Sequence, residues 1–292
     1  MLLTVFTPTY NRAYIIENLY KSLQRQTCKD FEWVVVDDGS TDNTEDLLAI
    51  WQHESSFHVK YIKQENGGKH RAINRGVKEA QGELFFIVDS DDYLADDAIE
   101  KIFIHYNKIK ENKDFAGVCG LRCYPDGQRI GGECDFGIID CNSLDFRYKY
   151  KVQGDMAEVI RTDVMREFPI PEFDGEKFCP EALFFYRIAQ KYKLRFFYEK
   201  IYICDYLPDG LTAQITKIRM QSPRASMLFY AEQTHYKIPM AQKIKAAINY
   251  WRFSFCSSIG VTERIHQVSL FWIVFLPLGY ILHQIDSNKI KL

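Results

Sequence analysis

The stretch Gly82-Glu-Leu-Phe-Phe-Ile-Val-Asp-Ser-Asp-Asp-Tyr93 indicates what kind of fold this sequence forms. Its apolar run, residues 84–88, has the length and composition of a buried strand and ends in Asp89, Asp91 and Asp92. Three carboxylates within four residues repel one another unless a positive charge lies between them. Oxygen ligands of this kind suit Mg²⁺ or Mn²⁺. The alternative is a solvated acidic turn that caps the following helix.

The segments before this stretch alternate between strand and helix patterns. Short apolar strands are predicted at residues 2–7, 31–36 and 59–62, and helices at 14–26, 44–51 and 72–80. This alternation predicts an α/β fold, a mostly parallel sheet flanked by helices. In such sheets the strands end at one edge, where ligands bind. Four polar turns are therefore expected around one cleft: residues 7–12, 37–42, 66–71 and 89–92.

Taken singly, these turns have ordinary interpretations. Asp37-Asp38-Gly-Ser is a common strand-to-helix turn. Gly67-Gly68-Lys69 is too short for a Walker A loop, although backbone N–H groups and one ammonium there would suit a phosphate. No GxGxxG motif opens the first strand-to-helix turn, so a dinucleotide site is disfavoured. The combination at one sheet edge is more informative than any single turn.

That combination resembles the family 2 inverting glycosyltransferases, which have the GT-A fold. The resemblance is carried by Thr7-Pro-Thr-Tyr-Asn-Arg12, Val34-Val-Val-Asp-Asp-Gly-Ser-Thr-Asp42, Glu65-Asn-Gly-Gly-Lys-His70, Ala72-Ile-Asn74 and Asp89-Ser-Asp-Asp92. These motifs occur in order within about residues 1–115, and a weaker similarity continues to about residue 215. The resemblance implies a metal-dependent enzyme that transfers a sugar from a nucleotide-sugar donor, with inversion at the anomeric carbon.

The resemblance also implies roles for individual residues in binding the donor. Pro8, Tyr10 and Asp38 would frame the nucleoside, with Asp38 accepting a hydrogen bond from a uracil or thymine imide. Lys69 would lie near the base or the diphosphate, and Asp89 near the ribose.

The metal site and the sugar pocket are implied by the same resemblance. Asp91 would hold the Mg²⁺ or Mn²⁺ that bridges the diphosphate and offsets the charge on the leaving group. Asp155 is a candidate for the donor-sugar pocket.

An inverting transferase needs a base that takes the proton of the acceptor hydroxyl. The family supplies an acid at the start of a helix, and Pro180-Glu-Ala-Leu-Phe-Phe-Tyr-Arg-Ile-Ala189 fits that pattern with Glu181 as the base. Pro180 departs from the pattern, because it replaces the first acid of a Glu-Asp pair. Glu181 also suits a plain first-turn acid that favours the helix dipole. Glu176 and Asp174 are the nearest rivals.

Two further segments bear on the reaction. Residues 205–212 resemble the loop that closes over the donor diphosphate, where Thr212 with Lys217 or Arg219 would touch phosphate; the alternative is a plain exposed loop. Gln221-Ser-Pro-Arg224-Ala225 lacks the Trp of the Gln-x-x-Arg-Trp motif that processive synthases carry. Addition of a single sugar is therefore expected.

The chain is expected to divide into a GT-A domain, residues 1–215, and a helical extension, residues 216–292. The extension holds ten Lys or Arg against three acids in a chain of net charge −2, which suggests an anionic lipid surface and not nucleic acid as its partner. Its apolar stretch 268–282 would reach roughly 22 Å as a helix, short of a hydrocarbon core of about 30 Å. It suits the membrane interface, with Trp272 and Tyr280 at headgroup level. A buried helix or an oligomer contact is the alternative.

The cysteines and the N-terminus indicate a compartment. Eight cysteines include no C-x-x-C pair or zinc set, so reduced cytosolic thiols are expected. The first strand begins at once, and no signal peptide is predicted. A cytoplasmic enzyme, peripheral on the inner face of the cell membrane, is the resulting expectation.

The whole sequence thus predicts transfer of one sugar, from a UDP-sugar, to a hydroxyl of a glycan or polyprenyl-linked acceptor in cell-surface polysaccharide synthesis. A sugar-phosphate nucleotidyltransferase is a rival, but residues 7–12 lack its glycine-rich loop. A non-catalytic glycan- or membrane-binding scaffold is the second rival, and the presence of Asp89, Asp91 and Glu181 argues against it.

Overall fold

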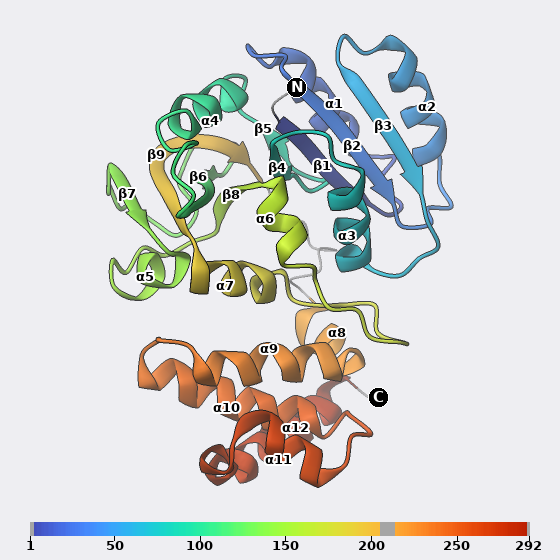
Figure 1. Cartoon of the computed structure of the whole chain (residues 1–292). Coiled ribbons are helices and arrows are strands. Elements are labelled where there is room, and N and C mark those ends of the chain that lie inside the picture. Colours follow the sequence, from blue (N-terminus) through green and yellow to red (C-terminus); the bar gives the residue numbers. More distant parts are fainter. Residues whose placement is uncertain (1–2, 205–213, 291–292) are drawn as a thin grey trace. The chain divides into compact units, whose positions relative to one another are not determined.

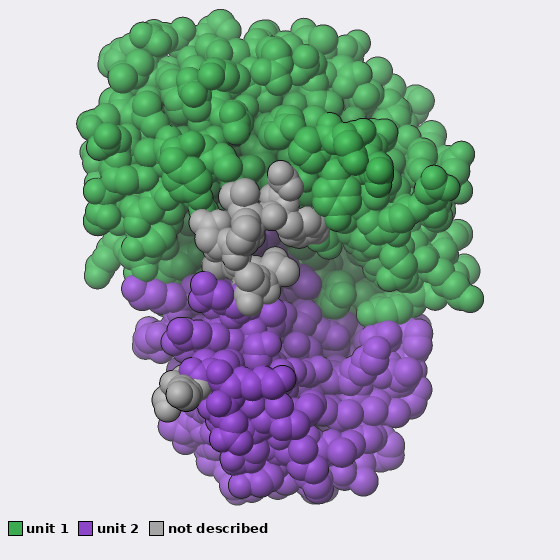
Figure 2. Space-filling model, turned by 180° about the vertical axis from the view of Figure 1, so that it is seen from behind, with its two compact units in different colours: residues 1–169, 184–206 green, residues 170–183, 207–292 purple. Residues whose placement is uncertain are grey.

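The computed structural model describes residues 3–204 and 214–290 (Figure 1). The chain forms two compact units, coloured separately in Figure 2. The first comprises Met1–Pro169 and Phe184–Tyr206, and the second comprises Ile170–Leu183 and Leu207–Leu292. These units place residues 170–183 with the C-terminal helices, a grouping that the sequence did not indicate. The division into domains at residue 215 stays a prediction.

The N-terminal half of the first unit is the predicted parallel arrangement. Its elements are β1 (Leu3–Thr9), α1 (Glu17–Arg25), β2 (Phe31–Asp37), α2 (Thr44–Glu54), β3 (His58–Lys63), α3 (Lys69–Glu79) and β4 (Leu84–Ile87). The strands lie in the order β3-β2-β1-β4, and every neighbouring pair is parallel. Phe6 of β1 lies opposite Val34 of β2 on one side and Ile87 of β4 on the other.

The second half of this unit extends the sheet with mixed strand directions. It contains β5 (Tyr93–Leu94), α4 (Ala98–Tyr106), β6 (Phe115–Cys123), β7 (Ile138–Cys141), α5 (Ser143–Tyr148), β8 (Met156–Arg161), α6 (Thr162–Glu167) and β9 (Lys193–Ile203); α7 (Glu181–Lys191) precedes β9. The order continues from β4 as β8-β6-β9-β5, and β7 pairs with β9.

The strand directions bring particular strand ends together. β8 is antiparallel to β4 and to β6, and β9 is parallel to β6. Six strands therefore run the same way, namely β1, β2, β3, β4, β6 and β9, and β8 runs in the opposite direction. The carboxyl ends of these six strands and the amino end of β8 form one edge of the sheet, which we call the carboxyl edge.

Helices cover both faces of the parallel strands because the strand side chains alternate between the faces. One face packs Val5, Trp33 and Phe86 against buried residues of α1, α2 and α4. The other face carries Phe6, which stacks on Phe85 with ring centroids 5.1 Å apart. Gly76 of α3 lies against Phe6 so closely that any Cβ there would be 2.1 Å from the ring. Both faces of the parallel strands are thus packed, and the carboxyl edge is left for polar turns.

The second unit is helical. It contains α8 (Ile215–Gln221), α9 (Pro223–His235), α10 (Met240–Ser254), α11 (Val261–Val268), a 3-10 turn (Leu270–Phe275) and α12 (Leu276–Ile290). Trp251 of α10 is buried and its indole N–H donates to the carbonyl of Trp272 at 2.8 Å. Gly279 lets α12 approach α10, since a Cβ would lie 2.4 Å from that of Trp251.

Two details of the C-terminal prediction were wrong. The helical stretch runs from Leu270 to Ile290, 21 residues, so it is long and apolar enough to cross a membrane by length and composition. Polar residues follow Leu282, so hydropathy alone underestimates the length of this helical stretch. Trp272 is buried at 6% exposure and packs in the helical core, so it is not available at a headgroup level, whereas Tyr280 is 47% exposed.

Candidate functional site

The carboxyl edge gathers most of the predicted site residues. Those at or next to the strand ends of this edge are Pro8, Tyr10, Asp38, Lys69, Asp89, Asp91 and Asp155. Thr212 lies outside the described residues. Glu181 is the first residue of α7, whose first three residues are grouped with the second unit and the rest with the first. The roles given to these residues stay predictions, but the meeting of the first group at one edge is a property of the fold.

The turn after β1 is tied to the turn after β2. The N–H of Asn11 donates to Ser40 Oγ at 2.8 Å, and its side-chain oxygen accepts from the N–H of Thr41 at 2.8 Å. Pro8 is buried in β1 opposite Val36, while Tyr10 is 48% exposed at the end of the strand. The exposed Tyr10 ring is therefore carried by a turn that hydrogen bonds hold in place.

Asp38 organises the glycine loop. Its carboxylate accepts from Gln64 Nε2 and from the N–H groups of Gly67 and Gly68, at 2.7 to 2.9 Å, and from Asn66 Nδ2 at 3.2 Å. Gly68 has φ +98°, a conformation that favours glycine. Both oxygens of Asp38 are thus engaged by the loop that leads into α3. A role in accepting from a nucleobase stays a prediction.

Lys69, the first residue of α3, joins this loop to the acidic turn. Its Nζ lies 2.6 Å from Asp89 Oδ1, and both side chains are partly exposed. Burial alone would raise the pKa of Asp89, but Lys69, with Arg122 and Arg12, holds it below the usual value. Asp89 is therefore a carboxylate that already has its countercharge.

Asp91 and Asp92 are in a different electrostatic position. Burial and the charge of Asp89 raise the pKa of Asp91. Burial and the charge of Asp89 also raise the pKa of Asp92 to about 7. Asp91 Oδ2 lies 4.0 Å from an Arg12 nitrogen, at the limit of an ion pair. This part of the turn is short of positive charge.

Two residues at the site were missed in the sequence. Tyr202 ends β9 next to the acidic turn, and its hydroxyl donates to Asp92 Oδ2 at 2.6 Å. The guanidinium carbon of Arg122 lies 4.2 Å from the centre of the Tyr202 ring. Both positions result from the directions of β6 and β9, which local sequence pattern does not reveal.

The donor atoms at this edge suit a hard divalent cation. Among the described residues, no group of three or more His, Cys, Asp or Glu side chains is arranged to hold a metal. Mg²⁺ and Mn²⁺ bound with a nucleotide take one or two carboxylates from the protein and the rest from phosphate and water. Asp91 has little positive charge near it, so its carboxylate is suited to be one of these protein ligands of the cation.

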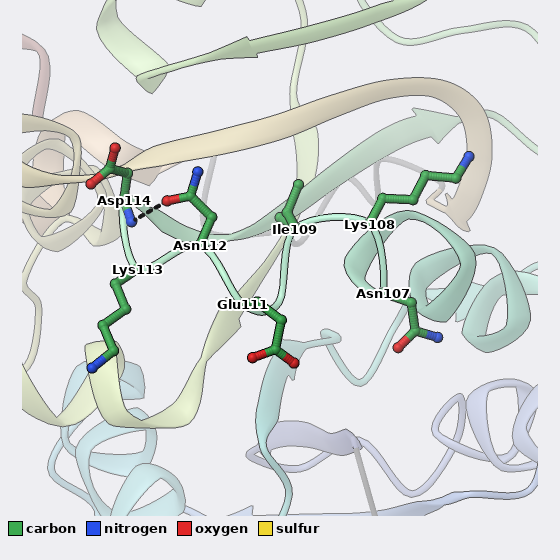
Figure 3. A pocket seen from close by; sticks show the side chains of 7 residues that line it. All are labelled: Asn107, Lys108, Ile109, Glu111, Asn112, Lys113 and Asp114. Carbon is green, nitrogen blue, oxygen red and sulfur yellow. Dashed lines mark hydrogen bonds between the residues drawn. The ribbon is translucent and has the colours of Figure 1, made fainter.

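A separate hollow in the first unit is unrelated to this edge. It is lined by the turn from Asn107 to Asp114, has a volume of about 540 Å³ and carries both acidic and basic side chains (Figure 3). The turn leads into β6, which runs in the direction of β4. The hollow therefore lies at the opposite edge of the sheet from the acidic turn.

In the second unit, Glu176 has a structural contact. Its two carboxylate oxygens accept from the N–H groups of Arg224 and Ala225, at 2.7 and 2.9 Å, and so cap the N-terminus of α9. Glu176 is 7% exposed. Of the acids near the start of α7, Glu176 is therefore committed to holding a helix, a contact that the sequence did not suggest.

Comparisons with known proteins agree with this geometry. The family model described as "Glycosyl transferase family 2" matches residues 4–154, just over half of the chain, and the chain belongs to that family. The matched residues include β1 to β4 and the turns after them at the carboxyl edge.

Three individual proteins illustrate the likeness. The poly(ribitol-phosphate) beta-N-acetylglucosaminyltransferase TarP of Staphylococcus aureus is 34% identical over 111 residues, which cover 37% of this chain and 33% of TarP. The structure of S. aureus TarS 1–349 with UDP-GlcNAc has a TM-score of 0.63 and 20% identity, covering 100% of this chain and 89% of that one. The mannosyltransferase PcManGT of Pyrobaculum calidifontis, solved with GDP-Man and Mn²⁺, has a TM-score of 0.56 and 18% identity, covering 98% and 86%.

The likeness to the solved structures concerns the fold. At about one fifth identity, the structures of TarS and PcManGT show that the chain has the GT-A fold. The sequence match to TarP spans about a third of that protein's length.

Proposed function

We propose that this protein transfers a single sugar from a nucleotide-sugar donor to a hydroxyl of a glycan acceptor, with inversion. The observation that carries the proposal is the carboxyl edge of a family 2 domain on which Lys69, Asp89 and Asp91 meet. A UDP-sugar is the favoured donor, since TarS was solved with UDP-GlcNAc.

On the donor side of the reaction, the negative charge that develops on the leaving group must be stabilised. In the proposed complex, Asp91 would hold Mg²⁺ or Mn²⁺, and the cation would supply positive charge to stabilise the departing nucleoside diphosphate. Asp89, kept ionised by Lys69 at 2.6 Å, would accept hydrogen bonds from the ribose hydroxyls. Pro8 and Tyr10 would line the nucleoside site. Asp155, which directly precedes β8, would line the pocket for the donor sugar.

On the acceptor side we assign Glu181 as the general base. The acceptor oxygen attacks the anomeric carbon, the bond to the diphosphate oxygen breaks, and the hydroxyl proton passes to the Glu181 carboxylate. Glu176 is a poor candidate because both its oxygens cap α9.

The two glutamates give a test of this assignment. Glu181→Gln is expected to lower kcat by about 10²- to 10⁴-fold with an unchanged melting temperature. Glu176→Gln is expected to lower the melting temperature, because an amide nitrogen would face a backbone N–H. A larger kcat loss in a folded Glu176→Gln protein would reverse the assignment.

The setting that we propose is cell-surface polysaccharide synthesis, with a glycan or polyprenyl-linked acceptor. TarP, whose name gives it a poly(ribitol-phosphate) acceptor, supports this class of substrate. A cytoplasmic location at the inner face of the membrane would bring the enzyme to such an acceptor.

A surface of the second unit supports membrane contact. Six apolar side chains, each 43–73% exposed, lie along one side of the helical stretch at spacings of mostly three and four residues: Leu270, Phe271, Val274, Leu278, Ile281 and Ile285. We call this set the apolar stripe. The opposite side of the stretch is buried, and there Asp286 pairs with Arg252. A helix with one apolar side exposed and one packed on protein suits a bilayer surface. The excess of basic residues in the whole extension, residues 216–292, suits anionic lipid.

Flotation with vesicles tests the membrane contact. The protein is expected to float with vesicles containing phosphatidylglycerol and to stay behind with pure phosphatidylcholine. The variant Val274→Glu/Ile281→Glu is expected to lose flotation, whereas Val261→Glu, on α11 outside the apolar stripe and 64% exposed, should keep it. Equal flotation of the stripe variant and the wild type would reject the apolar stripe as the contact.

The main experiment tests the donor. Purified protein with Mn²⁺ is titrated with UDP-, GDP- and dTDP-sugars, and the melting temperature is followed with and without EDTA. A ligand at 100 times its Kd adds about 2.7 kcal/mol, a shift of several degrees. We expect a metal-dependent shift with UDP-sugars that Asp91→Ala abolishes. No shift with any nucleotide in the folded protein would contradict the proposed function.

A further inference from the structure

Tyr202 is bonded to both ends of the acidic turn. The N–H of Asp89 donates to its hydroxyl oxygen at 3.0 Å, and the hydroxyl donates to Asp92 Oδ2 at 2.6 Å. Tyr202 has no exposed surface, and Asp92 is 7% exposed. One buried hydroxyl thus spans the turn from its first acid to its last.

Arg122 packs against the ring of Tyr202. Its guanidinium carbon lies 4.2 Å from the centre of the Tyr202 ring, within the range of a cation–π contact. Its Nε donates to the carbonyl oxygen of Met156 at 2.8 Å. Arg122 therefore fixes the ring and at the same time links it to the start of β8, next to Asp155.

We propose that Tyr202, supported by Arg122, is a positioning residue that sets the shape of the acidic turn and so presents Asp91 to the divalent cation of the donor complex. This inference rests on the proposed function. It assigns Asp92 to the protein interior and Asp91 to the cation.

The physical reason is that several carboxylates are held close together in a largely buried turn. Burial raises the pKa of Asp91 and of Asp92, and the neighbouring charge of Asp89 raises both further. A turn under such repulsion keeps one conformation only if fixed groups hold it. The Tyr202 hydroxyl supplies two hydrogen bonds without adding charge, so it restrains the turn and leaves the negative charge of Asp91 for a cation.

A second tyrosine provides a matched control. Tyr106 is 1% exposed and its hydroxyl donates to Glu83 Oε1 at 2.5 Å. Glu83 directly precedes β4, at the edge opposite to the acidic turn. Tyr106 and Tyr202 are thus both buried tyrosines that donate to a carboxylate in a segment next to β4, and of the two only Tyr202 touches the proposed cation site.

The experiment compares Tyr202→Phe with Tyr106→Phe. Mn²⁺ is titrated into each protein with UDP present, and free Mn²⁺ is followed by electron paramagnetic resonance. Loss of a hydrogen bond to a charged group corresponds to about a 10- to 100-fold change in an equilibrium constant. We expect Tyr202→Phe to weaken Mn²⁺ binding by about that factor, and Tyr106→Phe to leave it within about twofold.

Arg122→Lys keeps the positive charge but loses the planar contact with the ring, and we expect it to weaken Mn²⁺ binding by a smaller factor. It also serves as the test if Tyr202→Phe does not fold. Wild-type affinity in either folded variant of the Tyr202–Arg122 pair, or equal losses in Tyr202→Phe and Tyr106→Phe, would overturn the inference alone. Absence of Mn²⁺–UDP binding by the wild type would overturn the proposed function, and the inference with it.

Discussion

Two acidic turns flank β1, and they use their carboxylates in opposite ways. In the turn after β2, Asp37 accepts from the Ser40 N–H and from the Tyr61 hydroxyl, each at 2.7 Å. Asp38 accepts from four donors of the glycine loop. Every carboxylate oxygen of this Asp pair is bonded within the protein.

The turn after β4 is not balanced in this way. Lys69 supplies one ammonium to Asp89, and Tyr202 one hydroxyl to Asp92. Burial and mutual repulsion raise the pKa of Asp91 and of Asp92. A carboxylate whose hydrogen bonds are complete shapes the fold, whereas one with a cationic contact as long as the 4.0 Å between Asp91 and Arg12 is a candidate to bind a positively charged ligand.

The largest effect that separates the two turns is expected from Asp91→Ala. If Asp91 is the cation ligand, transfer should fall by about 10³-fold, since several kcal/mol of charge stabilisation are lost. The melting temperature of the free protein should stay the same or rise, because one repelling charge is removed. Rate assays and thermal unfolding, both in Mn²⁺-containing and EDTA-treated buffer, check this.

Glu111→Ala is the control for that variant, since Glu111 lies in the exposed turn at the other edge of the sheet (Figure 3). It should leave the rate unchanged. A marked fall in the stability of Asp91→Ala would mean that this turn is balanced like the other one.

The next effect in size is expected at Asp38. In Asp38→Asn an NH₂ group replaces one oxygen and faces donors from the glycine loop, such as the Gly68 N–H at 2.7 Å from the present oxygen. The free energy of unfolding should fall by about 2 to 4 kcal/mol. Chemical denaturation measures it, with the exposed Asp46→Asn as control. A stability loss below about 0.5 kcal/mol, the usual range for surface changes, would show that the loop does not depend on Asp38.

The features of the two turns that depend on local sequence pattern could be predicted from the sequence. The apolar run before Asp89 and the alternation of strands and helices indicated the parallel strands and brought both turns to one edge. The resemblance identified the family, and the family model confirms it. The chemical type of the site residues could thus be predicted from the sequence, whereas their contacts could not.

The contacts that the sequence did not reveal depend on strand direction and on distant partners. Arg122 and Tyr202 reach the acidic turn only because β6 and β9 run parallel to β4, and their positions carry no motif. Glu176 appeared as a rival base because a capping contact with residues 48 and 49 positions away cannot be read locally. Hydropathy does not tell which side of a helix packs on protein, so the burial of Trp272 could not be predicted from the sequence.

The smallest effect concerns Asp92 and its pH dependence. The pKa of Asp92 is raised to about 7 in the folded protein, whereas an unfolded aspartate has a pKa of about 3.9. The folded state therefore binds this proton more tightly, and the free energy of unfolding falls through this group as the pH rises from about 4 to about 7. Asp92→Asn removes that loss and keeps an oxygen to accept from Tyr202.

The expected result is a metal-free Asp92→Asn protein that matches the wild type near pH 4 and is more stable by roughly 1 to 3 kcal/mol at pH 8. Denaturation at several pH values, with EDTA, measures the difference. Asp42→Asn is the comparison on the other acidic turn: hydrogen bonds from Thr44 and Ala13 outweigh burial and lower the pKa of Asp42, so its stability relative to the wild type should fall above about pH 4. If the difference in stability between Asp92→Asn and the wild type does not grow with pH, the pKa of Asp92 is not raised to about 7 in the folded protein. The two turns would then differ less than their hydrogen bonds imply.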